Sequence, residues 1–234
     1  MLLAELEIRH TRANLPTRRV ALGARWLPVD PVPGFGGVLL GGVVASRVDA
    51  LEGDELKDLL RLTDDLEGGR RISQPRLRHR FQTDVVGLDR SRHKLMGDGE
   101  LLWFELDEHG APVPQLLGAV YAAAQMPKTA RPAVFRVIRR AVRWRGPLGP
   151  TFIAYLSSDE AARAWRTFPL DERWALQVLG FAPEAFLSRD GIQRRFRDLV
   201  RRVHPDTGAD AYGAGQRILE LTEARRILLQ LQPE

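Results

Sequence analysis

Apolar residues recur at helical spacing near the C-terminal end of the chain. Ile192, Phe196, Leu199 and Val203 are separated by steps of four, three and four, so they share one face of a helix. The cations of the same stretch lie on its other side: Arg194, Arg195, Arg197, Arg201 and Arg202. The pattern therefore predicts a helix over residues 192–203 with one apolar face and one strongly cationic face.

A proline and several glycines separate this helix from a second one. Pro205 disfavours helix at the residue before it and lacks a backbone donor, so the first helix should stop there. Glycines within 207–215 permit the chain to reverse. A second apolar face follows, formed by Ile218, Leu221, Ala224, Ile227 and Leu228. We therefore expect two antiparallel helices whose apolar faces pair.

The longer part of the chain, before Pro169, mixes extended and helical patterns. Strands are expected over residues 6–10, 19–22, 101–107 and 152–156. Helices are expected over residues 49–66, 115–125, 133–144 and 157–167. We therefore predict an α+β protein: a mixed domain over 1–167, built from an antiparallel sheet and several helices, followed by a small helical domain over 170–234.

A glycine-rich segment, residues 34–44, invites comparison with phosphate-binding loops. It lacks the Gly-Lys-Ser/Thr ending of a P-loop and the spaced glycines that open a dinucleotide-binding helix. We therefore expect a buried strand, or a pair of strands, bent at the glycines.

Composition excludes several classes of protein. The chain has 234 residues, of which 44% are hydrophobic and 28% charged, as in ordinary globular domains. It contains no cysteine, which excludes disulfides, thiolate zinc sites and a cysteine nucleophile. Its acidic N-terminal residues do not fit a signal peptide, and its longest apolar run, 36–46, is too short to span a bilayer. We expect a soluble cytoplasmic protein with no membrane span.

Titratable residues do not form a pattern that predicts catalysis. The histidines show neither metal-ligand spacing nor the order of a Ser/His/Asp triad: His10, His79, His93, His109 and His204. The first four are expected to be surface or structural residues. The sequence therefore predicts a protein that is not an enzyme and that has no metal or cofactor.

The C-terminal elements together resemble the J-domain of DnaJ-type co-chaperones. Residues 176–181, Leu-Gln-Val-Leu-Gly-Phe, resemble the first helix of that family, 192–203 the second and 218–228 the third. Between the last two stands His204-Pro205-Asp206, which resembles the signature loop of the family. The resemblance covers residues 171–229, about the last quarter of the chain.

Two positions depart from the family pattern. Thr207 follows the tripeptide where a lysine is usual, and Arg225 replaces a common aromatic residue near Ala224. The chain also lacks the Gly/Phe-rich linker and the cysteine-bound zinc domain of many relatives. The place of the motif near the C-terminal end, after an unrelated domain, suggests a specialised co-chaperone.

The resemblance implies a partner and a division of labour. The tripeptide loop and the cationic helix face would dock on an ATP-bound DnaK-class chaperone and stimulate its ATP hydrolysis. Asp206 would accept charge-assisted hydrogen bonds from a cation of the partner, while His204 and Pro205 hold the loop in shape. The arginines of the helix would steer the encounter with an acidic patch. Residues 1–167 would select the client protein or the location.

An alternative hypothesis concerns the arginine-rich segments of the first domain. The helix expected over 133–144 contains Arg136, Arg139, Arg140 and Arg143. The basic stretch 70–94 adds further cations, although an edge strand kept soluble by outward charge is the favoured explanation for it. Such segments can bind nucleic acid or an anionic surface in a salt-sensitive way, with the J-like region as a degenerate module. The net charge of +5 is too modest to predict this alone.

Overall fold

The protein is described here by a computed structural model over residues 1–11, 19–70, 80–81, 88–99, 101–159, 170–203 and 211–232. These residues form an α+β structure, as the sequence predicts. The chain divides into two compact units, Met1–Arg143 and Trp144–Glu234.

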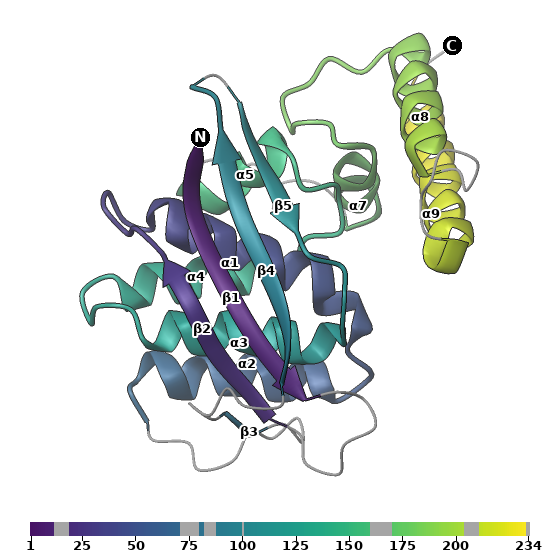
Figure 1. The fold of residues 1–234 in the computed structure, drawn as a ribbon. Helices are drawn as coiled ribbons and strands as arrows, with labels where there is room; N and C mark the ends of the chain where they lie inside the picture. The colour runs from purple at the N-terminus through teal and green to yellow at the C-terminus, as the bar shows by residue number, and fades with distance from the viewer. Residues whose placement is uncertain are drawn as a thin grey trace. The chain divides into compact units, whose positions relative to one another are not determined.

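One layer of the first unit is a sheet with the strand order β3-β2-β1-β4-β5 (Figure 1). Its strands are β1 Leu2–Thr11, β2 Arg19–Trp26, β3 Arg80–Phe81, β4 Leu88–Gly97 and β5 Leu102–Leu106. The central strand β1 is antiparallel to β2 and β4, and β4 is antiparallel to β5, whereas the two-residue β3 runs parallel to β2. The strands expected over 6–10, 19–22 and 101–107 are thus present.

The basic stretch 70–94 supplies the two-residue edge strand β3, Arg80–Phe81, and also an inner strand of the sheet. Its described part includes most of β4, which pairs with β1 on one side and β5 on the other. The outward charges of β4 therefore reflect an open sheet face rather than an open sheet edge. Residues 71–79 and 82–87 lie outside the described part of the chain.

Helices of the same unit cover one face of the sheet (Figure 1). They are α1 Gly34–Arg47, α2 Glu55–Glu67, α3 Pro112–Ala124 and α4 Arg131–Ala141, with a short 3-10 helix at Val48–Ala50. α1 and α3 contact the strands directly, and α2 and α4 pack against those two helices. Gly118 allows the close approach of α3, because a Cβ there would lie 2.5 Å from a methyl carbon of Ile8 on β1.

The glycine-rich segment 34–44 forms most of α1, so the strand prediction was wrong. Residues 36–44 are all buried, and an apolar run without a polar side has no periodicity that separates helix from strand. The glycines make room for neighbours instead of bending a strand. A Cβ at Gly42 would overlap the ring of Phe104, and one at Gly36 would lie 2.9 Å from the Cα of Leu27.

The described helices of the second unit are α5 Pro150–Ser157, α7 Leu170–Leu179, α8 Arg189–Val203 and α9 Ala211–Gln230. The strand expected over 152–156 is therefore wrong: those residues form α5. A five-residue apolar run is ambiguous by itself, and Pro150 suits the first turn of a helix. Most of the helix expected over 157–167 lies outside the described residues.

The chain passes between the units at Arg143 and Trp144, earlier than the boundary expected at Pro169. The ring of Trp144 lies 5.4 Å from that of Phe152 and 5.2 Å from that of Tyr155, both on α5. Gly146 lies against the backbone of Gln177 on α7. Packing thus joins the segment after Arg143 to the helical unit. Pro169 itself lies outside the described residues.

α8 and α9 pack along each other in opposite directions, and α7 contacts both (Figure 1). Ile192 and Leu199 of α8 are buried, as are Leu221, Ala224 and Leu228 of α9. The helices expected from the apolar spacing are therefore present. α9 begins earlier than expected, at Ala211 within the glycine-containing segment, because neighbouring alanines favour helix and offset a cost of about 1 kcal/mol per glycine.

Candidate functional site

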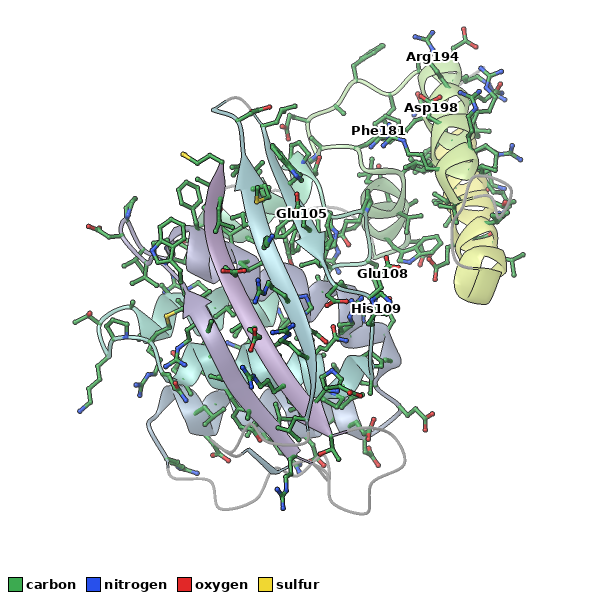
Figure 2. All side chains as sticks on the ribbon, in the orientation of Figure 1. Glu105, Glu108, His109, Phe181, Arg194 and Asp198 are labelled. Carbon is green, nitrogen blue, oxygen red and sulfur yellow. The ribbon has the colours of Figure 1, made fainter. Side chains whose placement is uncertain are left out.

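The cationic face of α8 is exposed over most of its length. Arg194, Arg197 and Arg201 follow steps of three and four, so they form one stripe along the helix. These residues and Arg202 are exposed, whereas Ile192 is fully buried. Figure 2 shows Arg194 projecting from α8 near the start of the helix. The arrangement presents several guanidinium groups, which suit carboxylate or phosphate partners.

Arg195 differs from the other arginines of the predicted site because it is engaged within the unit. Its Nε donates a hydrogen bond of 2.9 Å to the backbone oxygen of Leu179, the last residue of α7. Burial, together with repulsion from Arg202, lowers the pKa of the Arg195 guanidinium from its ordinary value. The sequence grouped Arg195 with the partner-facing cations, but the structure places it in the contact between α7 and α8.

The end of α7 explains why Arg195 is needed there. Gly180 adopts a φ of +69°, its N–H donates to Gln177 O at 3.1 Å, and the N–H of Phe181 donates to Leu176 O at 2.9 Å. This is a Schellman-type cap, which satisfies two of the last carbonyl groups of the helix. Arg195 satisfies a further one, at Leu179. The residues Leu179-Gly180-Phe181 thus end α7 and fix its position against α8.

Arg225 of α9 keeps a contact with α8 although it is not aromatic. Its guanidinium carbon lies 4.3 Å from the centroid of the Phe196 ring. A cation over an aromatic face contributes about 0.5–1 kcal/mol at partly exposed sites. The departure from the family pattern at Arg225 is therefore compatible with a packed pair of helices.

The tripeptide His204-Pro205-Asp206 lies outside the described residues. In the sequence it follows directly on Val203, the last residue of α8, and precedes Ala211, the first residue of α9. It therefore belongs to the connection that starts at the Arg201–Arg202 end of the cationic helix.

The arginines of the alternative hypothesis do not form one open surface on α4. Arg139 Nη1 lies 2.7 Å from Glu67 Oε2 and 3.3 Å from Asp64 Oδ1, both on α2. Arg140 is half-buried, and Arg136 and Arg143 are exposed. Arg139 therefore joins α4 to α2.

A buried polar cluster lies on the helix-covered face of the sheet. Ser91 Oγ donates to the backbone oxygen of His109 at 3.0 Å, and His10 Nε2 lies 3.0 Å from the same Oγ. His93 is fully buried, and neither of its ring nitrogens has a hydrogen-bond partner among the described residues. Burial, with repulsion from the Arg47 guanidinium, lowers the pKa of His93 to about 4. His93 is therefore neutral at pH 7.

This polar cluster is closed to solvent. His10, Ser91 and His93 are each at most 1% exposed, so a substrate cannot reach them directly. Strand alternation could have located the cluster in the sequence, because these residues share a face with apolar ones such as Leu6 and Leu95. Spacing along the chain alone does not bring β1 and β4 together.

The described part of the chain contains neither a metal-binding cluster nor a membrane-spanning helix. Within it, no group of three or more His, Asp or Glu side chains is placed to hold a metal ion. None of its helices is both long enough and apolar enough to cross a membrane.

Comparison with protein-family models, curated proteins and solved structures finds no match for this chain.

Proposed function

We propose that the protein is a J-domain co-chaperone that stimulates ATP hydrolysis by a DnaK-class chaperone. The observation that carries this proposal is the form of α8. The helix buries Ile192 and Leu199, exposes a stripe of arginines, and leads at Val203 into His204-Pro205-Asp206. An amphipathic cationic helix, the tripeptide and a packed antiparallel helix are the features on which the resemblance to the J-domain depends.

The arginine stripe gives α8 the electrostatics that docking requires. Arg194 and Arg201 are seven residues apart, which is roughly 10 Å along a helix. Such a row matches an acidic patch on a chaperone and attracts it over roughly one Debye length, about 8–10 Å near physiological salt. The attraction raises the association rate more than the final affinity. The interaction should therefore weaken as salt is added.

In this mechanism the protein performs no chemistry of its own. Asp206 accepts hydrogen bonds from a cation of the chaperone, and His204 and Pro205 shape the loop. The co-chaperone stimulates hydrolysis by binding the hydrolysis-competent state of the chaperone more tightly than its resting state. A tenfold shift of that equilibrium requires a difference of about 1.4 kcal/mol in binding free energy. The first unit, by its separate fold, would select the client or the location.

A single-turnover ATPase assay with a DnaK-class chaperone tests the proposal. The full chain should accelerate hydrolysis, and the His204→Gln variant should not. Loss of charge in an Arg194→Gln/Arg197→Gln variant should reduce stimulation at low salt more than at high salt. Arg226→Gln is the matched control, because Arg226 is an exposed arginine of the same unit that already pairs with Glu223 on α9. Equal activity of the His204→Gln variant and the unaltered chain would reject the proposal.

A further inference from the structure

The sheet has one face that no described helix of its own unit covers (Figure 1). Leu6, Ile8 and His10 of β1 point to the opposite face, where α1 and α3 pack. Because side chains alternate along a strand, the open face carries the residues between them and their cross-strand partners. These are Glu5, Glu7 and Arg9 on β1 and Arg90, Arg92 and Lys94 on β4.

Three arginines on this face share one carboxylate. Glu7 Oε1 lies 2.7 Å from Arg9 Nε, and its Oε2 lies 3.2 Å from Arg92 Nη2 and 3.8 Å from Arg90 Nη1. The Glu7 side chain is only 3% exposed, whereas Arg9, Arg92 and Arg90 are 30%, 46% and 63% exposed. The carboxylate thus lies beneath a layer of guanidinium groups that face outward.

The backbone is adapted to hold Glu7 in this position. A Cβ at Gly23 of β2 would lie 2.7 Å from the carboxyl carbon of Glu7, so glycine leaves the space that the side chain occupies. Burial by itself raises the pKa of Glu7, but hydrogen bonds from Arg9 and Arg92 outweigh it and lower the pKa below the ordinary value. Glu7 is therefore ionised at neutral pH and keeps the arginines in fixed positions.

Positive charges outnumber negative ones around Glu7, because three arginines share its one carboxylate. Arg9 and Arg90 are direct cross-strand partners, an arrangement in which like charges repel. Glu7 is their shared counterion, and Arg92 also reaches Glu5 at 3.4 Å. The next row across the sheet alternates Glu5, Lys94 and Glu105. Excess positive charge is therefore confined to the Arg9–Arg90 end, where an additional anion would relieve the repulsion.

Exposed aromatic residues lie farther along the same face. Trp103 of β5 pairs with Met96, and its indole is 38% exposed. Met96 is six residues from Arg90, which is about 20 Å along a strand. Figure 2 labels Glu105 on β5, and Trp103 lies two residues before it on the same strand. An indole within two or three nucleotides of a phosphate-binding site is the combination by which sheets bind unstacked bases.

We propose that the open face of this sheet binds single-stranded nucleic acid. Arg9 and Arg90 hold backbone phosphates over Glu7, and a base stacks on Trp103. A duplex would not fit this role, because its bases are already stacked and cannot cover an indole on a pleated surface. This inference concerns the first unit and does not depend on the co-chaperone function of the second.

Fluorescence anisotropy of labelled 12-nucleotide oligo(U) and oligo(dT) with the full chain tests the proposal. Arg90→Gln should weaken binding roughly fivefold at 0.1 M salt and lower the salt slope by roughly 0.7, the value for one phosphate contact to a single strand. Trp103→Ala should weaken binding at least about fivefold with an unchanged slope, because stacking is not ionic. Arg90→Lys should retain most of the affinity, since it keeps the charge.

Matched controls separate this surface from the other cationic ones. Arg143→Gln removes an exposed charge at the end of α4, and Arg197→Gln removes one from α8; neither should change binding by more than twofold. Glu7 retains Arg9 and Arg92 in the Arg90→Gln variant, so the sheet should remain intact, which circular dichroism can verify.

The proposal is overturned if the unaltered chain does not bind either oligonucleotide. It is equally overturned if Arg143→Gln or Arg197→Gln weakens binding as much as Arg90→Gln does. The Arg90→Gln variant should stimulate the ATPase of a DnaK-class chaperone as well as the unaltered chain does. Failure of the nucleic-acid proposal therefore leaves the co-chaperone proposal intact.

Discussion

Arg195 on α8 donates from its Nε to the backbone oxygen of Leu179, which ends α7. The contact joins two helices through a group that no apolar pattern reveals. It also places a positive charge at a helix C-terminus, where the macrodipole favours cations. One arginine of a helix with a cationic face is thus used to position that helix, while its neighbours remain exposed.

Replacement of Arg195 by alanine should destabilise the second unit. A hydrogen bond from a charged donor contributes about 1.5–3 kcal/mol, and Arg195 is half-buried, so a loss of about 1–2 kcal/mol in the free energy of unfolding is expected. Urea denaturation followed by circular dichroism measures it. Arg194→Ala, at an exposed neighbouring position, is the control and should change stability by less than about 0.5 kcal/mol. Equal losses in the two variants would contradict the structural role of Arg195.

Replacement of Gly180 by alanine should also destabilise the unit, for two separable reasons. The residue has a φ of +69°, and a Cβ there would lie 2.8 Å from Arg195 Nη2 and 3.1 Å from Pro147 Cγ. Left-handed backbone costs a non-glycine residue about 1 kcal/mol, and the contacts add to it. Gly53→Ala tests the backbone term alone, because Gly53 has a φ of +40° and open space around it. A larger loss at Gly180 than at Gly53 is expected in thermal denaturation. The reverse order would show that the contacts with Arg195 and Pro147 are unimportant.

The helical periodicity of α8 and the alternation of β1 were strong enough to predict those elements from the sequence. The prediction failed where a segment is apolar on all sides, as at Leu39 and Leu40 in α1, because a fully buried helix and a buried strand have the same composition. The strand prediction for the segment that contains Phe152 and Tyr155 failed for the same reason. Both rings pack on Trp144, so the second unit begins earlier than expected.

Candidate site residues were predictable only where they lie within one helix or strand. The exposed arginines of α8 follow from one helix and its spacing. The Glu7 cluster and the buried His93 require the register between β1 and β4, and Arg195 requires the position of α7. Strand alternation places His93 on the apolar face of β4, but the partners of these residues have no signal in one sequence, because they depend on which strand or helix lies next to the residue.

The buried histidine predicts an acid-sensitive fold. The pKa of His93 is about 4 in the folded chain and about 6.5 in an unfolded one, so the unfolded state binds more protons between these values. Stability should therefore fall as the pH drops from about 6.5 to about 4, by up to about 3 kcal/mol for this residue. Arg47, Asp107 and His10 face His93, and the lowered pKa of His10 acts in the same direction.

Urea denaturation at several pH values between 7 and 4.5 measures this dependence. His93→Leu should flatten the pH profile, because an apolar residue of similar size does not titrate. An unchanged profile in His93→Leu would show that another group causes the acid sensitivity.

The arginine cluster of the sheet should depend on Glu7. Glu7→Gln removes the shared counterion of three partly exposed arginines, so we expect a loss of about 1–3 kcal/mol in stability, less than for a fully buried pair. Gly23→Ala should have a similar effect, because its Cβ would displace the Glu7 carboxyl group. Thermal melts with and without phosphate measure both variants. Phosphate should stabilise Glu7→Gln more than the unaltered chain, and an equal effect on both would argue against an anion-binding cluster.

The proposed co-chaperone function predicts that the exposed stripe of α8 controls the rate of association with a DnaK-class chaperone. In the Arg194→Gln/Arg197→Gln variant two charges are removed without loss of the Arg195 contact, so the fold should be retained and the association rate should fall. Stopped-flow or surface-based kinetics at several salt concentrations measure the rate. The difference from the unaltered chain should be largest at low salt and should shrink as the Debye length falls to about 3 Å at 1 M. Arg226→Gln, which interrupts only a local pair with Glu223, should leave the rate unchanged. A change confined to the dissociation rate would mean that these arginines form short-range contacts in the complex and do not steer the encounter.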